Sequence, residues 1–423
     1  MLSIQTIREN PQWVIERLKV KNFDASEMID LVIDLDSQKR ETQKMLDDHL
    51  AESNRLSKEI ALCFKEGNKA EADSLKFRSQ ELKSVSKALE AGMSKLVVRI
   101  HDLMVQLPNL PQEGVPAGRT PDDNEEVESH GQMPALAQDA LPHWELAAKY
   151  DIIDFELGSK VTGAGFPFYK GKGAKLQRAL ITFFLDQAAE AGYTEYQTPL
   201  AVNEDSAYGT GQLPDKDGQM YCITDDQLWL IPTSEVTLTN IFRDVILRES
   251  DFPIKITAYS PCFRREAGSY GKDVRGLNRL HQFDKVEIVQ VTNPERSNQA
   301  LEEMREHAAS LIRKLNLPYR VLKLCGGDMS FASAMTYDFE VFSAAQKRWL
   351  EVSSVSNFES FQANRMKLRY KNADGKSVQA HTLNGSALAL PRIVAALLEN
   401  NQTPQGIIIP EVLRRYTGFD LID

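Results

Sequence analysis

The chain has 423 residues, which is enough for two or three domains. Its 42% hydrophobic and 26% charged residues are typical of a soluble globular protein. The formal net charge of −10 argues against a general binder of DNA or RNA, which is usually basic. Any contact with nucleic acid must therefore depend on a local basic patch.

Membrane and export signals are not apparent in the sequence. No run of about 18 apolar residues could span a membrane, and residues 1–10 lack the apolar core of a secretory signal. The cysteines are Cys63, Cys222, Cys262 and Cys325. Their wide separation, with no C-x-x-C pair, disfavours a disulfide framework and a zinc site. We therefore expect a protein of the reduced cytoplasm, with no membrane partner and no zinc.

Residues from about 27 to 105 predict a helical hairpin. The segment has no proline, and the pair Gly67-Asn68 interrupts it near its middle. Apolar residues recur every seven positions, less cleanly in the first half, where Leu46, Leu50 and Ile60 support the pattern. The clean repeat consists of Leu75, Leu82, Leu89, Leu96 and Leu103. Since Gly and Asn accept the backbone conformation that ends a helix, two coiled-coil arms should fold back on each other.

The distal half of this hairpin is basic in an acidic protein. Residues 55–99 contain ten lysines and arginines against six aspartates and glutamates, an excess of four positive charges. Such charges often only keep a coiled coil soluble or support a dimerisation rod. They could equally attract the phosphates of a nucleic acid, with Lys58, Lys65, Lys69, Lys76 and Arg78 as candidates.

A proline-rich segment separates the hairpin from the rest of the chain. Leu107-Pro108-Asn109-Leu110-Pro111 ends the helix, and an acidic stretch to Glu128 predicts a linker. We place the domain boundary between residues 110 and 111. Beyond it, we expect a helix over 171–191, a helix-like run over 236–246, and strands near 229–231, 254–256 and 286–288. Neither G-x-G-x-x-G nor a Walker A motif occurs, so phosphates are not held by those devices.

The most informative stretch runs from Cys262-Phe263-Arg264-Arg265-Glu266-Ala267-Gly268 to His281-Gln282-Phe283-Asp284-Lys285-Val286-Glu287. The pattern predicts two strands joined by a polar loop that contains Gly271-Lys272-Asp273. Arginines on rigid strands can hold an anionic phosphate. This stretch, from about 260 to 287, resembles motif 2 of the class II aminoacyl-tRNA synthetases, in the form found in bacterial seryl-tRNA synthetases.

Two further segments resemble motifs of the same family. Residues 192–199 resemble motif 1, which builds the homodimer interface, although they also fit a simple connection from helix to strand. Residues 383–400 predict a strand, a glycine turn and an apolar helix, and they resemble motif 3 with its ATP-binding Arg392. Ala387 and Pro391 replace glycines common in the family. Both departures are small, because proline is compatible with a helix start.

The resemblance also implies a serine site. Thr233, Ser234 and Glu235 match the loop that contacts serine, although these residue types also fit a helix N-cap. Glu287 would face the polar groups of serine, whereas a lone acid on a strand is usually exposed. Asn384 and Ser386 would complete the site, and the Arg264 side chain would reach the serine carboxylate.

The implied ATP site uses residues from three segments. Arg264 would bridge serine and the α-phosphate, and Glu266 would contact adenine. Phe283 would stack under the adenine ring, and Arg392 would lie on the other face of that ring. Without the resemblance, Phe283 would be interpreted as a core residue. Glu351 and Ser354 would bind Mg²⁺, which prefers oxygen ligands, although their strand could simply expose a polar face. The complete implied set is Arg264, Arg265, Glu266, Arg279, Leu280, Phe283, Glu351, Val352, Ser353, Ser354 and Arg392.

The resemblance covers nearly the whole chain and implies an α+β fold. A class II catalytic domain with an antiparallel sheet flanked by helices would follow an N-terminal antiparallel coiled-coil arm. The implied enzyme is a homodimer that joins serine to tRNA(Ser), and to tRNA(Sec) where present. A relative that loads a carrier protein is disfavoured by the arm, and a non-enzymatic RNA-binding protein is disfavoured by the intact Arg264, Glu266, Glu351 and Arg392. The scattered cysteines disfavour a zinc-dependent seryl enzyme.

Overall fold

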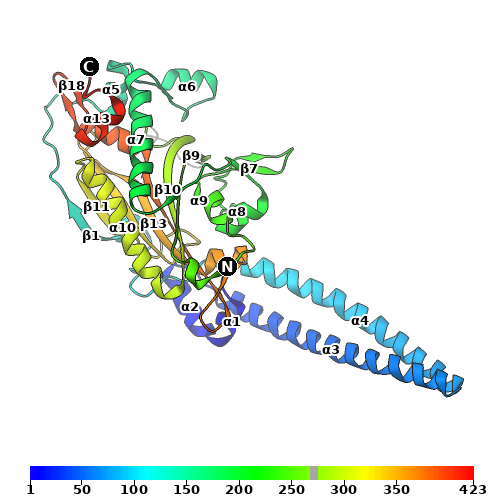
Figure 1. The fold of residues 1–423 in the computed structure, drawn as a ribbon. Coiled ribbons are helices and arrows are strands. Elements are labelled where there is room, and N and C mark those ends of the chain that lie inside the picture. The colour runs from blue at the N-terminus through cyan, green and yellow to red at the C-terminus, as the bar shows by residue number, and fades with distance from the viewer. Residues whose placement is uncertain (267–274) are drawn as a thin grey trace. The chain divides into compact units, whose positions relative to one another are not determined.

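The computed structural model describes residues 1–266 and 275–423. The chain divides into two compact units (Figure 1). The first, which we call the arm unit, holds residues 2–19 and 23–108. The second, the core unit, holds residue 1, residues 20–22 and residues 109–423.

The arm unit consists of helices. They are α1 (Ile4–Glu9), α2 (Pro11–Val20), α3 (Ser26–Lys65) and α4 (Lys69–Met104). Helices α3 and α4 pack along each other, which confirms the predicted hairpin (Figure 1). Gly67 has φ +75° at the turn, and the Asn68 side chain accepts a hydrogen bond from the Glu71 backbone at 3.4 Å. Leu82 and Leu56 are buried in the seam, but Leu50 is 63% exposed and does not support it.

The core unit is built on an eight-stranded sheet, as counted within the described residues. Its strands in spatial order are β1 (Glu125–His130), β11 (Tyr319–Lys323), β12 (Met335–Ser343), β13 (Arg348–Glu359), β16 (His381–Ala389), β10 (Gln282–Thr292), β9 (Ile254–Phe263) and β4 (Thr194–Glu195). Neighbouring strands are antiparallel except for the edge pair β4 and β9, which is parallel. The fold is therefore the mostly antiparallel α+β core that we expected.

Small sheets and helices surround this large sheet. The small strands are β2 (Ile153–Asp154), β3 (Phe168–Tyr169), β5 (Ala201–Val202), β6 (Cys222–Ile223), β7 (Leu228–Leu230), β8 (Ile246–Arg248), β14 (Arg369–Lys371), β15 (Ser377–Gln379), β17 (Gln402–Thr403), β18 (Gly406–Ile408) and β19 (Leu421–Ile422). The helices are α5 (His143–Lys149), α6 (Phe155–Val161), α7 (Gly171–Glu190), α8 (Glu204–Thr210), α9 (Glu235–Asn240), α10 (Ser297–Lys314), α11 (Phe361–Met366), α12 (Leu390–Asn400) and α13 (Glu411–Thr417).

One face of the sheet carries the main hydrophobic core. Helices α7, α10 and α12 pack against this face. Since side chains alternate along a strand, Val286 and Ile288 of β10 enter this core, and Glu287 between them points to the opposite face. Along β16, Leu383 and Ala387 likewise enter the core, and Asn384 and Ser386 point away from it. The opposite face therefore gathers polar residues of the two neighbouring central strands, β10 and β16.

Three expectations about local structure were wrong. The acidic end of the predicted linker forms the edge strand β1, because Glu125 and Glu128 pair with cations of the core unit, Lys323 and Arg305. The helix after Glu235 stops at Asn240 rather than at 246, and Asp244 has a left-handed φ of +59° that is incompatible with its continuation.

The third error concerns the segment 383–400. Strand β16 runs without a turn through Gly385 to Ala389. Glycine at position 385 avoids a tight contact, because an added Cβ would lie 3.0 Å from the Val355 side chain on the neighbouring strand. The helix begins directly after the strand, with Pro391 in its first turn as the sequence allowed.

Candidate active site

The polar face of the sheet brings β10 and β16 together at one point. Glu287 and Ser386 are directly opposite each other in the strand register. The Ser386 hydroxyl donates to Glu287 Oε2 at 3.4 Å, and both residues are buried. Asn384 lies two residues before Ser386 and is half-buried on the same face.

A lysine that the sequence analysis did not select holds Glu287 in place. Lys285 Nζ lies 2.7 Å from Glu287 Oε2, with both side chains almost fully buried. Burial raises the pKa of Glu287 above its ordinary value, while the charges of Lys285 and Arg264 oppose the rise. The signal was available in the sequence, because residues two apart on a strand share a face.

The segment before α9 supplies a second buried carboxylate. The Glu235 backbone N–H donates to Thr233 Oγ1 at 3.1 Å, and the Ser234 hydroxyl donates to the carbonyl of Ala258 at 3.4 Å. Ser234 therefore does not cap the helix through its side chain, although it occupies the N-cap position. All three side chains are buried beside the sheet.

The Glu235 carboxylate has a neutral partner. Gln362 of α11 donates its amide to Glu235 Oε1 at 2.7 Å and accepts from the Thr382 hydroxyl at 2.7 Å, which fixes the amide's orientation. Burial, assisted by the negative charge of Glu287, raises the pKa of Glu235 to about 7. Within the described residues no cation forms an ion pair with Glu235, although the charges of Lys285 and Arg264 oppose the rise of its pKa. Gln362 was also missed from the sequence.

The two ends of the motif 2 loop carry arginines, and the charge of Arg264 acts on both Glu235 and Glu287. The guanidinium of Arg264 lies over the ring of Phe283, at 5.2 Å from its centroid. Arg279 donates to Glu266 Oε2 at 3.2 Å, which joins the outgoing and returning ends of the loop. Arg265 is exposed, and its backbone N–H donates to the carbonyl of Gln219 at 2.8 Å. The predicted residues Gly271, Lys272 and Asp273 lie outside the described residues.

A β-bulge determines which face of the sheet each side chain of β13 points to. Glu351 is opposite Glu340 and Ser353 is opposite Phe339, so Val352 is the additional residue of the bulge. Residues three apart on a regular strand face opposite sides, but the bulge returns Glu351 and Ser354 to the same face.

The bulge also directs two predicted ATP-binding side chains into the core. Val352 belongs to the main hydrophobic core, and the Ser353 hydroxyl donates to the carbonyl of Ser386 at 2.6 Å. Leu280 is likewise buried in this core. Only the backbone groups of these three residues could meet a nucleotide.

Arg392, at the start of α12, is near Glu351. Its Nη1 donates to the carbonyl of Glu351 at 2.7 Å and lies 3.5 Å from the carboxylate Oε2. Its Nε donates to the carbonyl of Asn278 at 3.1 Å. Arg392 therefore joins β13 to the returning end of the motif 2 loop, and the structure brings the segments of all three predicted ATP-binding groups into contact.

Comparisons with known proteins agree with this geometry. Residues 1–111 match the seryl-tRNA synthetase N-terminal domain, and residues 221–401 match the tRNA synthetase class II core domain (G, H, P, S and T). The serine–tRNA ligase of Salinibacter ruber is 51% identical over 99% of this chain and 98% of its own length. That of Akkermansia muciniphila is 46% identical over 100% of this chain and 99% of its own length. The chain belongs to the seryl-tRNA synthetase family.

Solved structures support the same assignment. The seryl-tRNA synthetase of Pyrococcus horikoshii, complexed with ATP, has a TM-score of 0.93 and 32% identity, with coverage of 100% of this chain and 99% of its own. The cytoplasmic serine–tRNA ligase of Naegleria fowleri, in complex with AMP, has a TM-score of 0.89 and 28% identity, with the same coverage. The chain therefore has the fold of a class II aminoacyl-tRNA synthetase.

In this chain the class II core follows a helical segment that lies within the matched seryl-tRNA synthetase N-terminal domain. The five predicted tRNA-binding side chains of the arm unit, Lys58, Lys65, Lys69, Lys76 and Arg78, are all exposed. Arg78 lies 3.4 Å from Glu52 and 3.5 Å from Glu81, and Lys76 lies 3.4 Å from Asp73. No carboxylate in the described part of the chain forms an ion pair with Lys58, Lys65 or Lys69. These three are thus the cations most available to a phosphate.

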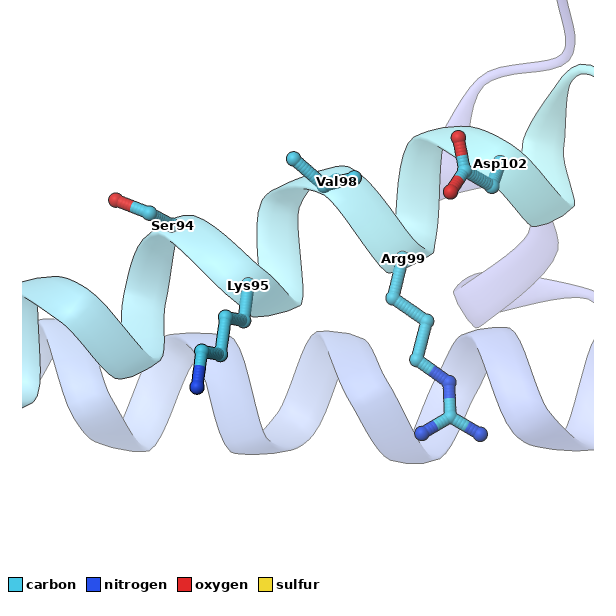
Figure 2. Close-up of a pocket in the computed structure, with 5 residues that line it drawn as sticks. All are labelled: Ser94, Lys95, Val98, Arg99 and Asp102. Atoms are coloured by element: carbon cyan, nitrogen blue, oxygen red, sulfur yellow. The ribbon is translucent and has the colours of Figure 1, made fainter.

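The arm unit also has a hollow on helix α4 (Figure 2). Figure 2 shows Lys95 and Arg99 on one side of the helix and Ser94, Val98 and Asp102 on another. All five lining side chains are exposed and come from a single helix. The hollow is therefore a surface depression, separate from the polar cluster of the core unit.

The described residues contain neither a ready-made metal cluster nor a membrane-spanning helix. Within residues 1–266 and 275–423, no three His, Cys, Asp or Glu side chains are arranged to hold a metal ion by themselves. The same residues include no helix both long and apolar enough to cross a bilayer. Glu351 and Ser354 nevertheless place two oxygen donors on one face of β13, which suits an ion that takes its other ligands from phosphates and water.

Proposed function

We propose that this chain activates L-serine with ATP, forming seryl-adenylate and pyrophosphate, and then transfers the seryl group to the 3′ end of tRNA(Ser). The observation that carries the proposal is the buried polar cluster beside Arg264. It combines the carboxylate of Glu287, which is paired with Lys285, with the carboxylate of Glu235, whose hydrogen-bond partner is the neutral amide of Gln362. A tRNA(Sec) with the same recognition features would be charged in the same way.

The cluster suits serine because its two carboxylates differ. The ammonium of serine would bind Glu235, since a cation relieves the cost of burying that charge. The serine hydroxyl would bind between Glu287, Ser386 and Asn384, and Thr233 and Ser234 would border the amino acid. Alanine has a hydrogen where serine has its hydroxyl, so alanine would leave these buried polar groups without partners and is disfavoured.

Adenylate formation needs alignment rather than a protein nucleophile. The serine carboxylate attacks the α-phosphate itself, and Arg264 would neutralise charge on both groups as they approach. Phe283 would support the adenine ring, with Glu266 at its edge and Arg392 opposite. Arg265 and Arg279 are exposed near the loop, where they could meet the phosphate chain.

Glu351 and Ser354 would hold the magnesium ion that accompanies ATP. Bound there, Mg²⁺ would offset the negative charge of the phosphates. The bulge at Val352 keeps the oxygens of Glu351 and Ser354 on the same face of β13, so both could bind one ion. Arg392, 3.5 Å from the Glu351 carboxylate, would hold that side chain near the nucleotide.

Serine-dependent exchange of pyrophosphate into ATP tests the proposal. A panel of the twenty amino acids should give exchange with serine, and exchange with another amino acid alone would contradict the assignment. We expect Arg264→Ala to lower the rate by at least about 100-fold, because a charge-stabilising group is lost. Exchange within about threefold of the parent, from a folded variant, would exclude the role of Arg264.

A further inference from the structure

A buried histidine and a buried glutamate pack against residues 276–278, at the C-terminal end of the motif 2 loop. His143, at the start of α5, and Glu399, near the end of α12, are both fully buried. His143 Nδ1 lies 2.7 Å from Glu399 Oε1, and the His143 backbone N–H donates to the same oxygen at 3.0 Å. None of the serine, ATP or tRNA contacts proposed above uses this pair.

The hydrogen bonds of His143 assign its tautomer. The backbone N–H of Leu277 donates to His143 Nε2 at 2.8 Å, so Nε2 is the unprotonated acceptor. The proton therefore lies on Nδ1, which donates it to Glu399. These bonds to His143, together with one from Ser343, lower the pKa of Glu399 although its burial acts in the opposite direction. The imidazole thus connects a charged carboxylate of α12 to the backbone of the loop.

A second connection runs from the same carboxylate. Gln346 donates to Glu399 Oε1 at 2.9 Å and accepts from the Asn278 side chain at 3.0 Å. The carbonyl of Asn278 in turn accepts from Arg392 at 3.1 Å. Two consecutive loop residues, Leu277 and Asn278, are therefore attached to Glu399 through different partners.

The loop backbone fits closely against the imidazole. Gly276 has φ +67°, and a Cβ at this position would lie 2.2 Å from His143 Nε2. Residue 276 must be glycine for both reasons. Arg279, which pairs with Glu266, follows within three residues. A displacement of residues 276–278 would move both Arg279 and the acceptor that orients Arg392.

From this geometry we infer that His143 and Glu399 are positioning residues for ATP. They hold residues 276–278 so that Arg279 and Arg392 have fixed positions at the nucleotide. Among the described residues, neither side chain bonds directly to Glu235, Glu287 or Ser386, which we call the serine cluster. The inference rests on the proposed function only for the identity of the nucleotide site. It predicts that loosening the network weakens ATP binding and leaves serine binding unchanged.

The test uses two glycines with matched backbone conformations. Gly276→Ala introduces a side chain against His143, whereas Gly375→Ala, at φ +73°, meets nothing within 4 Å. Both variants carry similar backbone strain, so their difference reports the contact with His143. A third variant, Glu399→Gln, keeps the shape of the side chain but gives it an amide that competes with the existing donors.

The measurements are the ATP dissociation constant by calorimetry and the Michaelis constants for ATP and serine in pyrophosphate exchange. We expect Gly276→Ala and Glu399→Gln to weaken ATP binding by about tenfold, as for the loss of one or two buried hydrogen bonds. Serine constants should stay within about twofold of the parent, and Gly375→Ala should change neither constant.

The possible outcomes separate this inference from the proposed function. A parent protein without serine-dependent exchange would refute the proposed function, and the calorimetric ATP comparison would still test the positioning role. Equal changes in the ATP and serine constants, or unchanged constants with reduced stability, would show a merely structural network. Failure of both network variants to fold, when Gly375→Ala folds, would also overturn the inference.

Discussion

Glu235 and Glu287 illustrate how two carboxylates of one buried site can differ. Glu287 has the ammonium of Lys285 at 2.7 Å, whereas Glu235 has the neutral amide of Gln362 at the same distance. A charge buried without a counterion is costly, and a cationic ligand removes that cost. Of the two, Glu235 is therefore the one that gains more from a substrate ammonium.

The isolated charge of Glu235 should make protein stability depend on pH. Burial raises its pKa from 4.5 to about 7. Between these values the folded state binds the proton more tightly than the unfolded state, so the free energy of unfolding falls as pH rises through this window. We expect Glu235→Gln to remove up to about 3 kcal/mol of this decline.

Urea unfolding at pH 5 and pH 8 measures the effect of Glu235→Gln. The variant should lose less stability between the two pH values than the parent does. Glu113→Gln, which alters an exposed carboxylate, is the control and should behave like the parent. Equal losses for the parent and Glu235→Gln would show that Glu235 does not titrate in this window.

A second substitution tests the paired carboxylate. Glu287→Ala would leave Lys285 buried without a partner, which destabilises a protein and would confuse the assay. Glu287→Gln keeps one oxygen that can accept from Lys285 and Ser386 but removes the charge. We expect the Michaelis constant for serine to rise by about tenfold, since one charged hydrogen-bond partner is lost. The constant for ATP should change by less than about twofold.

Asp284→Asn is a matched control for Glu287→Gln. It makes the same acid-to-amide change on the same strand, but Asp284 bonds to Tyr259 and Gln177 instead of facing the serine cluster. It should leave the serine constant near the parent value. Comparable effects of Glu287→Gln on serine and ATP would contradict the assignment of Glu287 to the amino acid.

At the scale of elements, periodicity predicted much of the fold. Heptads identified α3 and α4 because a long two-helix seam requires a repeating apolar position. Alternation identified β9, β10 and β13, and an apolar helical face identified α7. The length of helix α9 was overestimated. Its β-branched and apolar residues are buried on several sides of the helix, so they do not form the single apolar stripe that marks where a helix ends.

Details that depend on partners far along the chain could not be predicted. The bulge at Val352 depends on pairing with Phe339 and Glu340 across a hairpin, which spacing within β13 does not reveal. Gln362 reaches Glu235 across 127 residues of sequence, so its role appears only once the chain is folded. Lys285 was different, since its position two residues before Glu287 already placed both on one face.

At the scale of the whole molecule, the exposed end of the sheet supports the proposed homodimer. Strand β4, in the motif 1 region, is the last strand and pairs only with β9 among the described strands. Exposed large apolar side chains occur next to β4, including Tyr196 and Leu200. Such edges and patches usually mark an interaction surface.

We expect light scattering to give twice the chain mass of 47.6 kDa at micromolar concentration. Tyr196→Asp with Leu200→Asp should shift the protein towards the monomer, since both charges would be buried in an interface. Met133→Asp, at an exposed site outside the motif 1 region, is the control. A monomeric parent protein would contradict the dimer proposal.

The arm unit should serve tRNA and not the chemistry of activation. Its helices pack on each other, and its exposed lysines belong to a unit separate from the one that holds the polar cluster. Deletion of residues 27–103 should therefore preserve serine-dependent pyrophosphate exchange but abolish charging of tRNA. Efficient charging by the shortened protein would show that the hairpin is a scaffold.

A charge-neutralising variant tests the same role without removing the hairpin. Lys58, Lys65 and Lys69 are exposed and have no carboxylate partner among the described residues, so changing all three to Gln should raise the Michaelis constant for tRNA. Each phosphate contact releases about one counterion, so the slope of affinity against salt should flatten by roughly two to three on logarithmic axes.

The control changes Lys19, Lys39 and Lys44 of the same unit, which lie outside the basic distal half, and should leave the slope unchanged. Equal slopes for both triple variants would show that the distal charges only keep the hairpin soluble.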